Sequence, residues 1–233
     1  MKGKAFALAG AAGAFVISGM ASAAYLGTEG DMNVGLTAVV VDSAAQGWDA
    51  LGYAGLTTYR IYANFDAAGG AITAVGDADG IFELGSRDGS FFNSAFGSDL
   101  APNPLFTGVA PDTLWDTFVT IGEEVATGAG GVPVTAASPG FNDQPGGGQA
   151  FGLAGNFTMA NSGWFIAGFP AIADAAPYTG LDPMSGEQTG GNGVLVAQLT
   201  VPSGAPNGVF GTNWRVSGVD ESGEAFDIIG SFD

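Results

Sequence analysis

LTTYRIYANF, from Leu56 to Phe65, is the stretch of sequence that decides the fold class. From Thr57 onward the residues alternate, so that one side of the segment carries Thr57, Tyr59, Ile61, Ala63 and Phe65. The other side carries Thr58, Arg60, Tyr62 and Asn64. A period of two with β-branched and aromatic residues predicts a half-buried β-strand, with one face toward a core.

Further segments rich in β-branched and aromatic residues are separated by Gly, Pro, Asn and Asp turns. We expect strands at Val34–Val41, Ala71–Val75, Ile81–Leu84, Leu114–Ile121, Ser162–Phe169, Val194–Val201, Val209–Val216 and Ala225–Ile229. Between them, residues 42–55, 123–155 and 174–191 are expected to be surface loops. The pattern predicts an all-β fold, a single β-sandwich of jelly-roll type with long Gly-rich surface loops.

Residues 1–23 have the pattern of a secretory signal peptide. Two lysines precede the apolar run Ala5–Met20, and the small residues Ala-Ser-Ala follow at 21–23. The order of charge, apolar run and small-residue site is typical of export. The run is also short for a membrane span, which needs ~20 residues. We therefore expect cleavage after Ala23 or Ala24, one domain over residues 24–233, and a secreted or cell-surface protein without a membrane span.

The charge balance is strongly acidic. The chain has 23 acidic and 5 basic residues, a net charge of −18 at pH 7. Both lysines lie in the predicted signal peptide, so three arginines and all 23 acidic residues remain, and the net charge becomes −20. Such a surface repels nucleic acid and anionic lipid. It also repels itself, so we expect salt or divalent cations to stabilise the fold.

Cysteine and histidine are both absent from the sequence. Without cysteine there is no disulfide, so a packed core must hold an exported domain together. The usual zinc and copper ligands are missing as well. A Ser-His or Cys-His nucleophile is excluded. We expect a protein that is not an enzyme and requires no cofactor.

Calcium is the one metal that the acidic turns suggest. Asp77 and Asp79 lie in the sequence Asp-Ala-Asp-Gly, and alternating aspartates in a Gly-containing turn provide part of the oxygen set that calcium needs. Asp220 and Glu221 form a weaker second candidate. An ordinary acidic turn is the favoured explanation of both patterns.

Aromatic residues suggest a polysaccharide as a partner, since a sugar ring has an apolar face that stacks on an aromatic ring. Trp48 and Tyr53 lie in the Gly-containing loop 42–55 and are the candidates for an exposed platform. The other three tryptophans, Trp115, Trp164 and Trp214, are expected on core faces of strands.

Paired carboxylates can hydrolyse glycosides without histidine or cysteine. Asp116, Glu123 and Glu124 are the candidates, although chance pairs are expected among so many acidic residues. Arg60 and Arg215 lie on polar faces of predicted strands, where pairing with nearby carboxylates is the expected role.

Several blocks of sequence occur in a characteristic order: TTYRIYANF, FFNSAFG, LWDTFVTIG, SGWFIAGF, VLVAQLTVPSG and FGTNWRV. In this order they resemble a group of exported bacterial proteins of unassigned function. Members often carry a C-terminal sorting tail with a Pro-Glu-Pro motif, which this sequence does not contain. The resemblance implies export and a β-rich domain, and it implies no catalytic residues.

Three functions remain open. The first is a non-enzymatic structural or adhesive role outside the cell, assisted by calcium, with other surface proteins as partners. The second is carbohydrate binding through exposed aromatic residues. The third is glycoside hydrolysis by two carboxylates.

Overall fold

The computed structural model describes residues 23–26, 34–77, 82–87, 90–129, 134–137, 157–159, 162–166, 173–203 and 208–232. Residues 1–22 of the predicted signal peptide lie outside these ranges. So do Asp79 and most of the loop predicted at 123–155. Within the described ranges, every helix is too short or too polar to cross a membrane.

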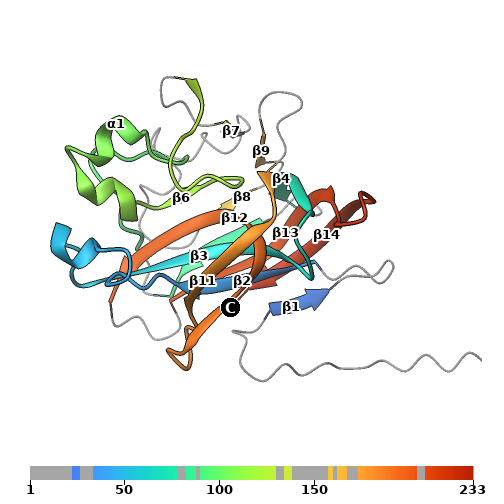
Figure 1. The fold of residues 1–233 in the computed structure, drawn as a ribbon, viewed down its shortest axis with the longest axis horizontal. Coiled ribbons are helices and arrows are strands. Elements are labelled where there is room, and N and C mark those ends of the chain that lie inside the picture. The colour runs from blue at the N-terminus through green and yellow to red at the C-terminus, as the bar shows by residue number, and fades with distance from the viewer. Residues whose placement is uncertain are drawn as a thin grey trace, which may run out of the picture.

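The described residues form two antiparallel sheets (Figure 1). The larger sheet has the strand order β1-β14-β13-β4-β9-β7, with β5, β8 and β10 attached beside this path. Its strands are β1 (Ala23–Leu26), β4 (Ala71–Asp77), β5 (Phe82–Ser86), β7 (Thr135–Ala137), β8 (Phe157–Met159), β9 (Gly163–Ile166), β10 (Ala173–Asp174), β13 (Val209–Val219) and β14 (Ala225–Phe232).

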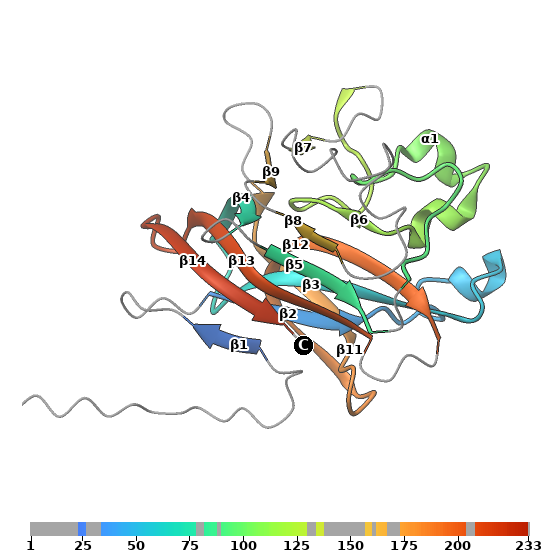
Figure 2. The ribbon, with the colours of Figure 1, turned by 180° about the vertical axis from the view of Figure 1, so that it is seen from behind.

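The smaller sheet has the order β11-β2-β3-β12-β6, and β11 also pairs with β12. Its strands are β2 (Gly35–Val40), β3 (Leu56–Phe65), β6 (Phe118–Val119), β11 (Ala176–Leu181) and β12 (Gln188–Pro202). The view from behind brings β13 and β14 of the larger sheet to the front (Figure 2). The two outer faces of the molecule therefore belong to different sheets.

The core lies between the two sheets. The side of β3 predicted to be apolar faces it, with Ile61 and Ala63 fully buried. From the larger sheet, Trp164 and Trp214 pack edge to face, with ring centroids 5.2 Å apart at 87°. Edge-to-face packing is a favoured arrangement of buried rings. The predicted all-β sandwich is confirmed, and its jelly-roll type stays a prediction.

The polar face of β3 is also covered, which the sequence did not predict. Thr58, Arg60 and Tyr62 on this face are 0%, 7% and 6% exposed. The prediction of a half-buried strand was therefore wrong, because other segments of the chain lie over the outer face of the smaller sheet. This cover creates the candidate site described below.

One covering segment is the β11–β12 hairpin, where the prediction of a surface loop over 174–191 was wrong. A Cβ atom on Gly190 would lie 2.3 Å from the carbonyl oxygen of Tyr178 on the opposite strand of the hairpin. A Cβ atom on Gly180 would lie 2.7 Å from Cγ2 of Val39 on β2. Glycine thus allows the hairpin to lie directly on the sheet, and it also removes the alternation of side chains that would have predicted strands.

The expected strand Leu114–Ile121 is another correction. Only β6 is a strand there, and Trp115 ends the 3₁₀ helix η2 (Pro111–Trp115), in which proline occupies the first turn. Proline is favoured at that position because its fixed φ suits a helix start. Before it lies the short helix α1 (Pro104–Thr107), and the 42–55 loop contains a second 3₁₀ helix, η1 (Trp48–Leu51). The remaining expected strands correspond to β2, β4, β5, β9, β12, β13 and β14.

Candidate functional site

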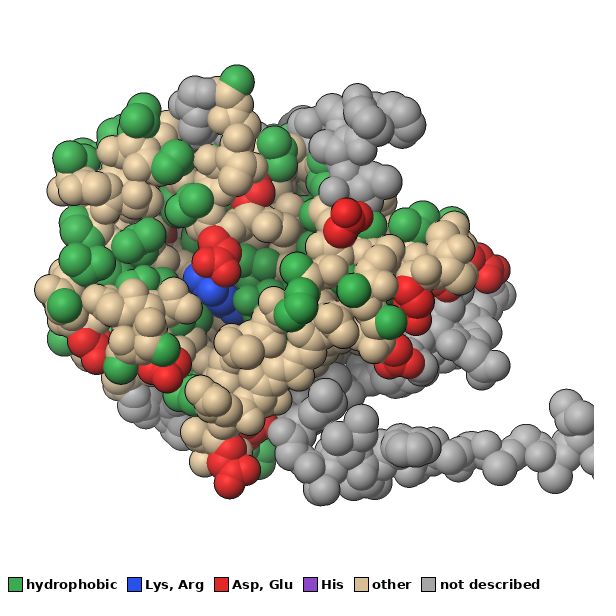
Figure 3. Space-filling model, viewed as in Figure 1, with side chains coloured by type: hydrophobic (Ala, Val, Ile, Leu, Met, Phe, Trp, Pro, Cys, Tyr) green, Lys and Arg blue, Asp and Glu red, His purple; other side chains and the backbone are tan. Residues whose placement is uncertain are grey.

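A groove with a cavity volume of about 250 Å³ lies on the outer face of the smaller sheet. Its floor is made by β3 and β12, one wall by β10 and β11, and the other wall by residues 122–124. Figure 3 shows this face, with a basic side chain below an acidic one in the hollow. This cavity, here called the groove, is lined by Gln46, Arg60, Tyr62, Gly122, Glu124, Asp174, Ala176, Pro177, Tyr178, Thr179, Gly193, Val194 and Leu195.

Arg60 and Glu124 form a two-pronged ion pair in the groove. Arg60 Nη1 donates to Glu124 Oε1 at 2.8 Å, and Nη2 donates to Oε2 at 3.1 Å. The Arg60 side chain is 8% exposed and that of Glu124 is 56% exposed. The cation is therefore buried and the carboxylate is open to solvent. The pair confirms the expectation that Arg60 joins a carboxylate.

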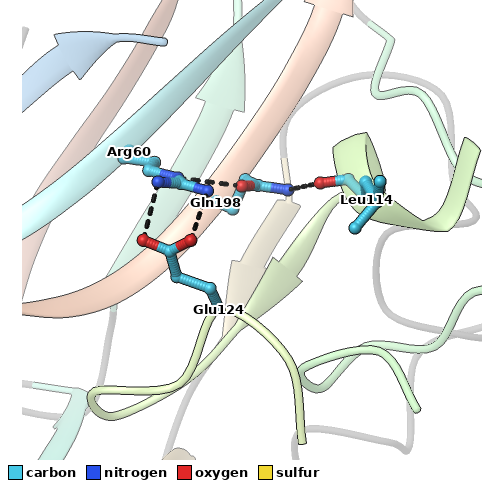
Figure 4. Close-up of polar contacts among 4 residues, drawn as sticks. All are labelled: Arg60, Leu114, Glu124 and Gln198. Atoms are coloured by element: carbon cyan, nitrogen blue, oxygen red, sulfur yellow. Dashed lines mark hydrogen bonds and ion pairs between the residues drawn. The ribbon is translucent and has the colours of Figure 1, made fainter. Parts of the chain in front are cut away.

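Gln198 on β12 fixes the orientation of the Arg60 side chain (Figure 4). Its Oε1 accepts a hydrogen bond from Arg60 Nε at 3.1 Å. Its Nε2 donates to the carbonyl oxygens of Leu114 at 2.9 Å and Asp116 at 3.0 Å. Gln198 is fully buried, and its amide links β3 to the last turn of η2 and the residue that follows it. The guanidinium group is held in place before any ligand arrives.

Two stacked tyrosines close one end of the groove. The rings of Tyr62 on β3 and Tyr178 on β11 lie 3.9 Å apart at 6°. The Tyr178 hydroxyl donates to Oδ1 of Asn64 at 2.6 Å. Burial raises the pKa of Tyr178 to about 12, and burial raises the pKa of Tyr62 against the opposing effect of Arg60. Both hydroxyls are therefore neutral hydrogen-bonding groups at physiological pH.

The chemistry of the groove suits a neutral polar ligand. The positive charge of Arg60 is already balanced by Glu124, so the pair has no net charge. Three of the five N–H bonds of the guanidinium are used by Glu124 and Gln198, and the exposed carboxylate keeps lone pairs toward solvent. Donors and acceptors side by side match adjacent hydroxyl groups, which both donate and accept.

Trp48 is not an exposed platform, which corrects the prediction. It is 4% exposed and packs against Tyr53 and Trp115, with ring centroids 5.5 Å and 5.8 Å away. Tyr53 is half-buried and its hydroxyl donates to Oγ1 of Thr58. The Arg60 guanidinium carbon lies 5.9 Å from the centre of the Trp48 ring, within the range of a cation–π contact. The aromatic cluster therefore contacts the Arg60 guanidinium through the ring of Trp48.

All four tryptophans are buried, at 4% exposure or less. The expected core positions of Trp164 and Trp214 are confirmed. Trp115 is buried as well, but in the cluster with Trp48 and Val41 and not between the sheets. Carbohydrate binding by an exposed tryptophan therefore has no support from these residues.

The three carboxylates considered for glycoside hydrolysis each hold a segment of backbone or an ion pair. Asp116 is 1% exposed and accepts from the backbone N–H groups of Ser94 and Ser98. Burial raises the pKa of Asp116 to about 7, although its hydrogen bonds act in the opposite direction.

Glu123 is 5% exposed and accepts from the backbone N–H groups of Thr127 and Val134, which closes a loop. Glu124 pairs with Arg60. Of the three carboxylates, Glu124 is the one that lines the groove. The second carboxylate in the lining is that of Asp174, which was not among the candidates.

The acidic turns have local explanations where they are described. Asp220 lies in the β13–β14 turn, and its Oδ1 accepts from Ser222 N, Ser222 Oγ and Glu224 N. These hydrogen bonds, above all the one from the Ser222 side chain, hold the pKa of Asp220 below its usual range. Glu221 is exposed in the same turn. Asp77 ends β4, and its partner Asp79 lies outside the described residues. Three acidic side chains suitable for one metal ion do not gather anywhere in the described part of the chain.

Sequence reasoning found Arg60 and Glu124 but assigned Glu124 a different role. It missed Tyr178 and Gln198. The polar residue Gln198 within the apolar segment VLVAQLTV was the one available signal, since a polar side chain in a buried strand needs partners.

Comparisons with protein-family models, with curated proteins and with solved structures found no match.

Proposed function

We propose that this protein is exported and acts outside the cell as a non-enzymatic adhesive protein, which holds a neutral saccharide in the groove. The observation that carries the proposal is the preformed ion pair of Arg60 and Glu124. The pair itself has no net charge, and it presents donors and acceptors side by side in a cavity of about 250 Å³ whose lining also includes Asp174.

The charge of the whole chain supports a neutral ligand. At a net charge of −18, the protein repels acidic polysaccharides over most of its surface. A neutral saccharide meets no such barrier, and hydroxyl groups replace the water around Glu124 at little cost. The composition of the predicted signal peptide supports export.

The absence of cysteine and histidine in the sequence supports a role without catalysis. The engagement of Asp116 and Glu123 in backbone hydrogen bonds supports it further, because these carboxylates would have to give up buried contacts to act as acid or base.

The test is retention of the purified protein on affinity gels containing neutral polysaccharides (hydroxyethyl cellulose, mannan and dextran) and, as an acidic comparison, alginate. We expect retention on at least one neutral gel and none on alginate. Glu124→Ala should weaken retention strongly, whereas Glu221→Ala, which removes an exposed carboxylate elsewhere, should leave it unchanged.

Glu124→Ala leaves Arg60 without its partner, so a loss of retention in this variant alone does not distinguish a lost binding site from misfolding. A second variant makes this distinction. Gln46→Thr changes an exposed residue of the groove that makes no part of the ion pair, and it should weaken retention without lowering the melting temperature. Retention as strong as that of the wild type in both groove variants would contradict the proposal.

Calcium enters this proposal through the net charge and the acidic turns. Cations should stabilise a chain of this charge by screening its self-repulsion. We expect CaCl₂ to raise the melting temperature more than NaCl at equal ionic strength. Equal effects of the two salts would reduce the role of calcium to screening.

A further inference from the structure

A second cavity, of about 290 Å³, lies on the outer face of the larger sheet, on the opposite side of the sandwich from the groove. It is lined by residues of β4, β9 and β13. We call it the trough. Two glycines make its floor: Gly76 on β4 and Gly163 on β9 are directly paired, and neither places a side chain on this face.

Larger side chains flank the two glycines on either side. Phe165 on β9 stands on one side and is 44% exposed, although its neighbour Trp164 is 1% exposed and faces the core. Arg215 on β13 stands on the other side and pairs with Gly76 in the register. Antiparallel partners and residues two apart point to the same face of a sheet. The aromatic ring and the guanidinium therefore flank one shallow depression.

Arg215 is held by a second ion pair. Its Nε donates to both oxygens of Asp227 on β14, at 2.8 and 3.0 Å, and its Nη2 also donates to Asp227. Ser217 Oγ donates to Asp227 Oδ1 at 3.0 Å. Hydrogen bonding from Arg215 holds the pKa of Asp227 below its usual range, so the carboxylate is ionised at neutral pH. Like the pair in the groove, this pair has no net charge.

The trough thus combines an exposed aromatic ring, a floor without side chains, and a neutral set of donors and acceptors. A pyranose ring has an apolar face of C–H groups and a rim of hydroxyl groups. The apolar face can stack on Phe165 while the rim reaches Arg215, Asp227 and Ser217. A flat apolar ligand would leave the ion pair unused, and an anionic ligand would meet the field of the acidic chain.

We propose that the trough is a second binding site for a neutral saccharide ring, with Phe165 as the stacking residue, so that the protein binds two saccharide chains at once on opposite faces. This inference rests on the proposed function and extends it. Two sites on one rigid sandwich would make the protein a cross-linker, which is what an adhesive role requires.

The experiment is isothermal titration of the purified full chain with an oligosaccharide cut from whichever neutral polysaccharide the gels identify. Cellohexaose and mannohexaose serve as the first two probes. We expect two sites per chain for the wild type and one site for Phe165→Ala, with affinity at the trough lowered about tenfold or more. Ile229→Ala removes an exposed apolar side chain on the same face but outside the trough, and it should leave both sites intact.

Ala74→Gln is the second variant, because a larger side chain at this lining position should block the trough without touching the ion pair. Turbidity of a mixture with the long polysaccharide reports cross-linking, which should require both sites. Phe165→Ala and Glu124→Ala should each abolish turbidity while keeping one site in the titration.

The outcomes separate the two proposals. One site in the wild type, lost in Glu124→Ala and kept in Phe165→Ala and Ala74→Gln, would overturn the trough and keep the groove. One site with the opposite response would support the trough and overturn the groove. Absence of binding to every neutral probe would overturn both.

Discussion

Replacing Gln198 by leucine should destabilise the protein strongly, because the amide of Gln198 joins three elements inside the fold. The substitution keeps most of the side-chain volume and removes three hydrogen bonds, to Arg60 Nε and to the carbonyl oxygens of Leu114 and Asp116. Each lost bond costs about 1 kcal/mol, and a buried group left without a partner costs about 1–3 kcal/mol. The expected loss in free energy of unfolding is therefore about 3–5 kcal/mol.

Urea denaturation at neutral pH and constant salt measures this loss. The midpoint should fall by about 1 M or more, with an unchanged slope if the unfolded state is unaffected. Gln188→Leu makes the same chemical change at an exposed position of the same strand and should change the free energy by less than about 0.5 kcal/mol.

The reasoning also predicts coupling between Gln198 and Arg60. Since the two side chains share a hydrogen bond, the effects of Gln198→Leu and Arg60→Met should not add in the double variant. If Gln198→Leu instead stays within about 1 kcal/mol of the wild type, the polar contacts would carry little net energy, and the argument that they hold Arg60 in place would fail.

Three further predictions concern the cover of the smaller sheet. Burial raises the pKa of Asp116 from 3.8 to about 7, so the folded protein holds a proton that the unfolded chain has lost. The free energy of unfolding should therefore fall between pH 4 and pH 7, by up to about 4 kcal/mol, and urea titrations of Asp116→Asn should show a flatter profile. Gly97→Ala places a Cβ atom 1.6 Å from Oδ2 of Asp116, so its melting temperature should fall well below that of Gly108→Ala, where nothing lies within 4 Å. Tyr178→Phe removes the hydrogen bond to Asn64 at a cost of about 1 kcal/mol and should speed amide hydrogen exchange in the β11–β12 hairpin, whereas unchanged exchange would mean that the hydroxyl does not hold the hairpin down.

The alternation in β3 was sufficient to predict the architecture, because the period of two and the apolar identity of Ile61 and Ala63 both follow from local sequence. The burial of the opposite face was not predictable in the same way. It depends on segments far away in sequence, such as Glu124, which lies 64 residues from Arg60, and Gln198, which lies 138 residues from it. A single sequence can indicate that a polar residue such as Gln198 needs partners, but it does not indicate which distant residues they are.

The hairpin shows the opposite problem. The segment around Gly190 has the composition of a loop, and glycine is usually unfavourable in strands. Here it is required because the backbone of β12 passes close to Tyr178, and a side chain at that position would collide with it. Composition therefore predicted the reverse of the structure at a place where two strands approach closely. The stacking residue Tyr178 was missed for the same reason.

The distribution of the few cations connects the two proposed sites. In a chain of net charge −18, most of the surface attracts counterions, and a ligand that binds there competes with them. Arg60 and Arg215 each neutralise one carboxylate in a two-pronged pair, and each pair borders one of the two cavities. At these two positions a neutral ligand meets strong hydrogen-bonding groups in an ion pair whose two charges balance. An arginine that served only to stabilise the fold could stand beside any of the many carboxylates, so its position at a cavity is the feature that favours binding.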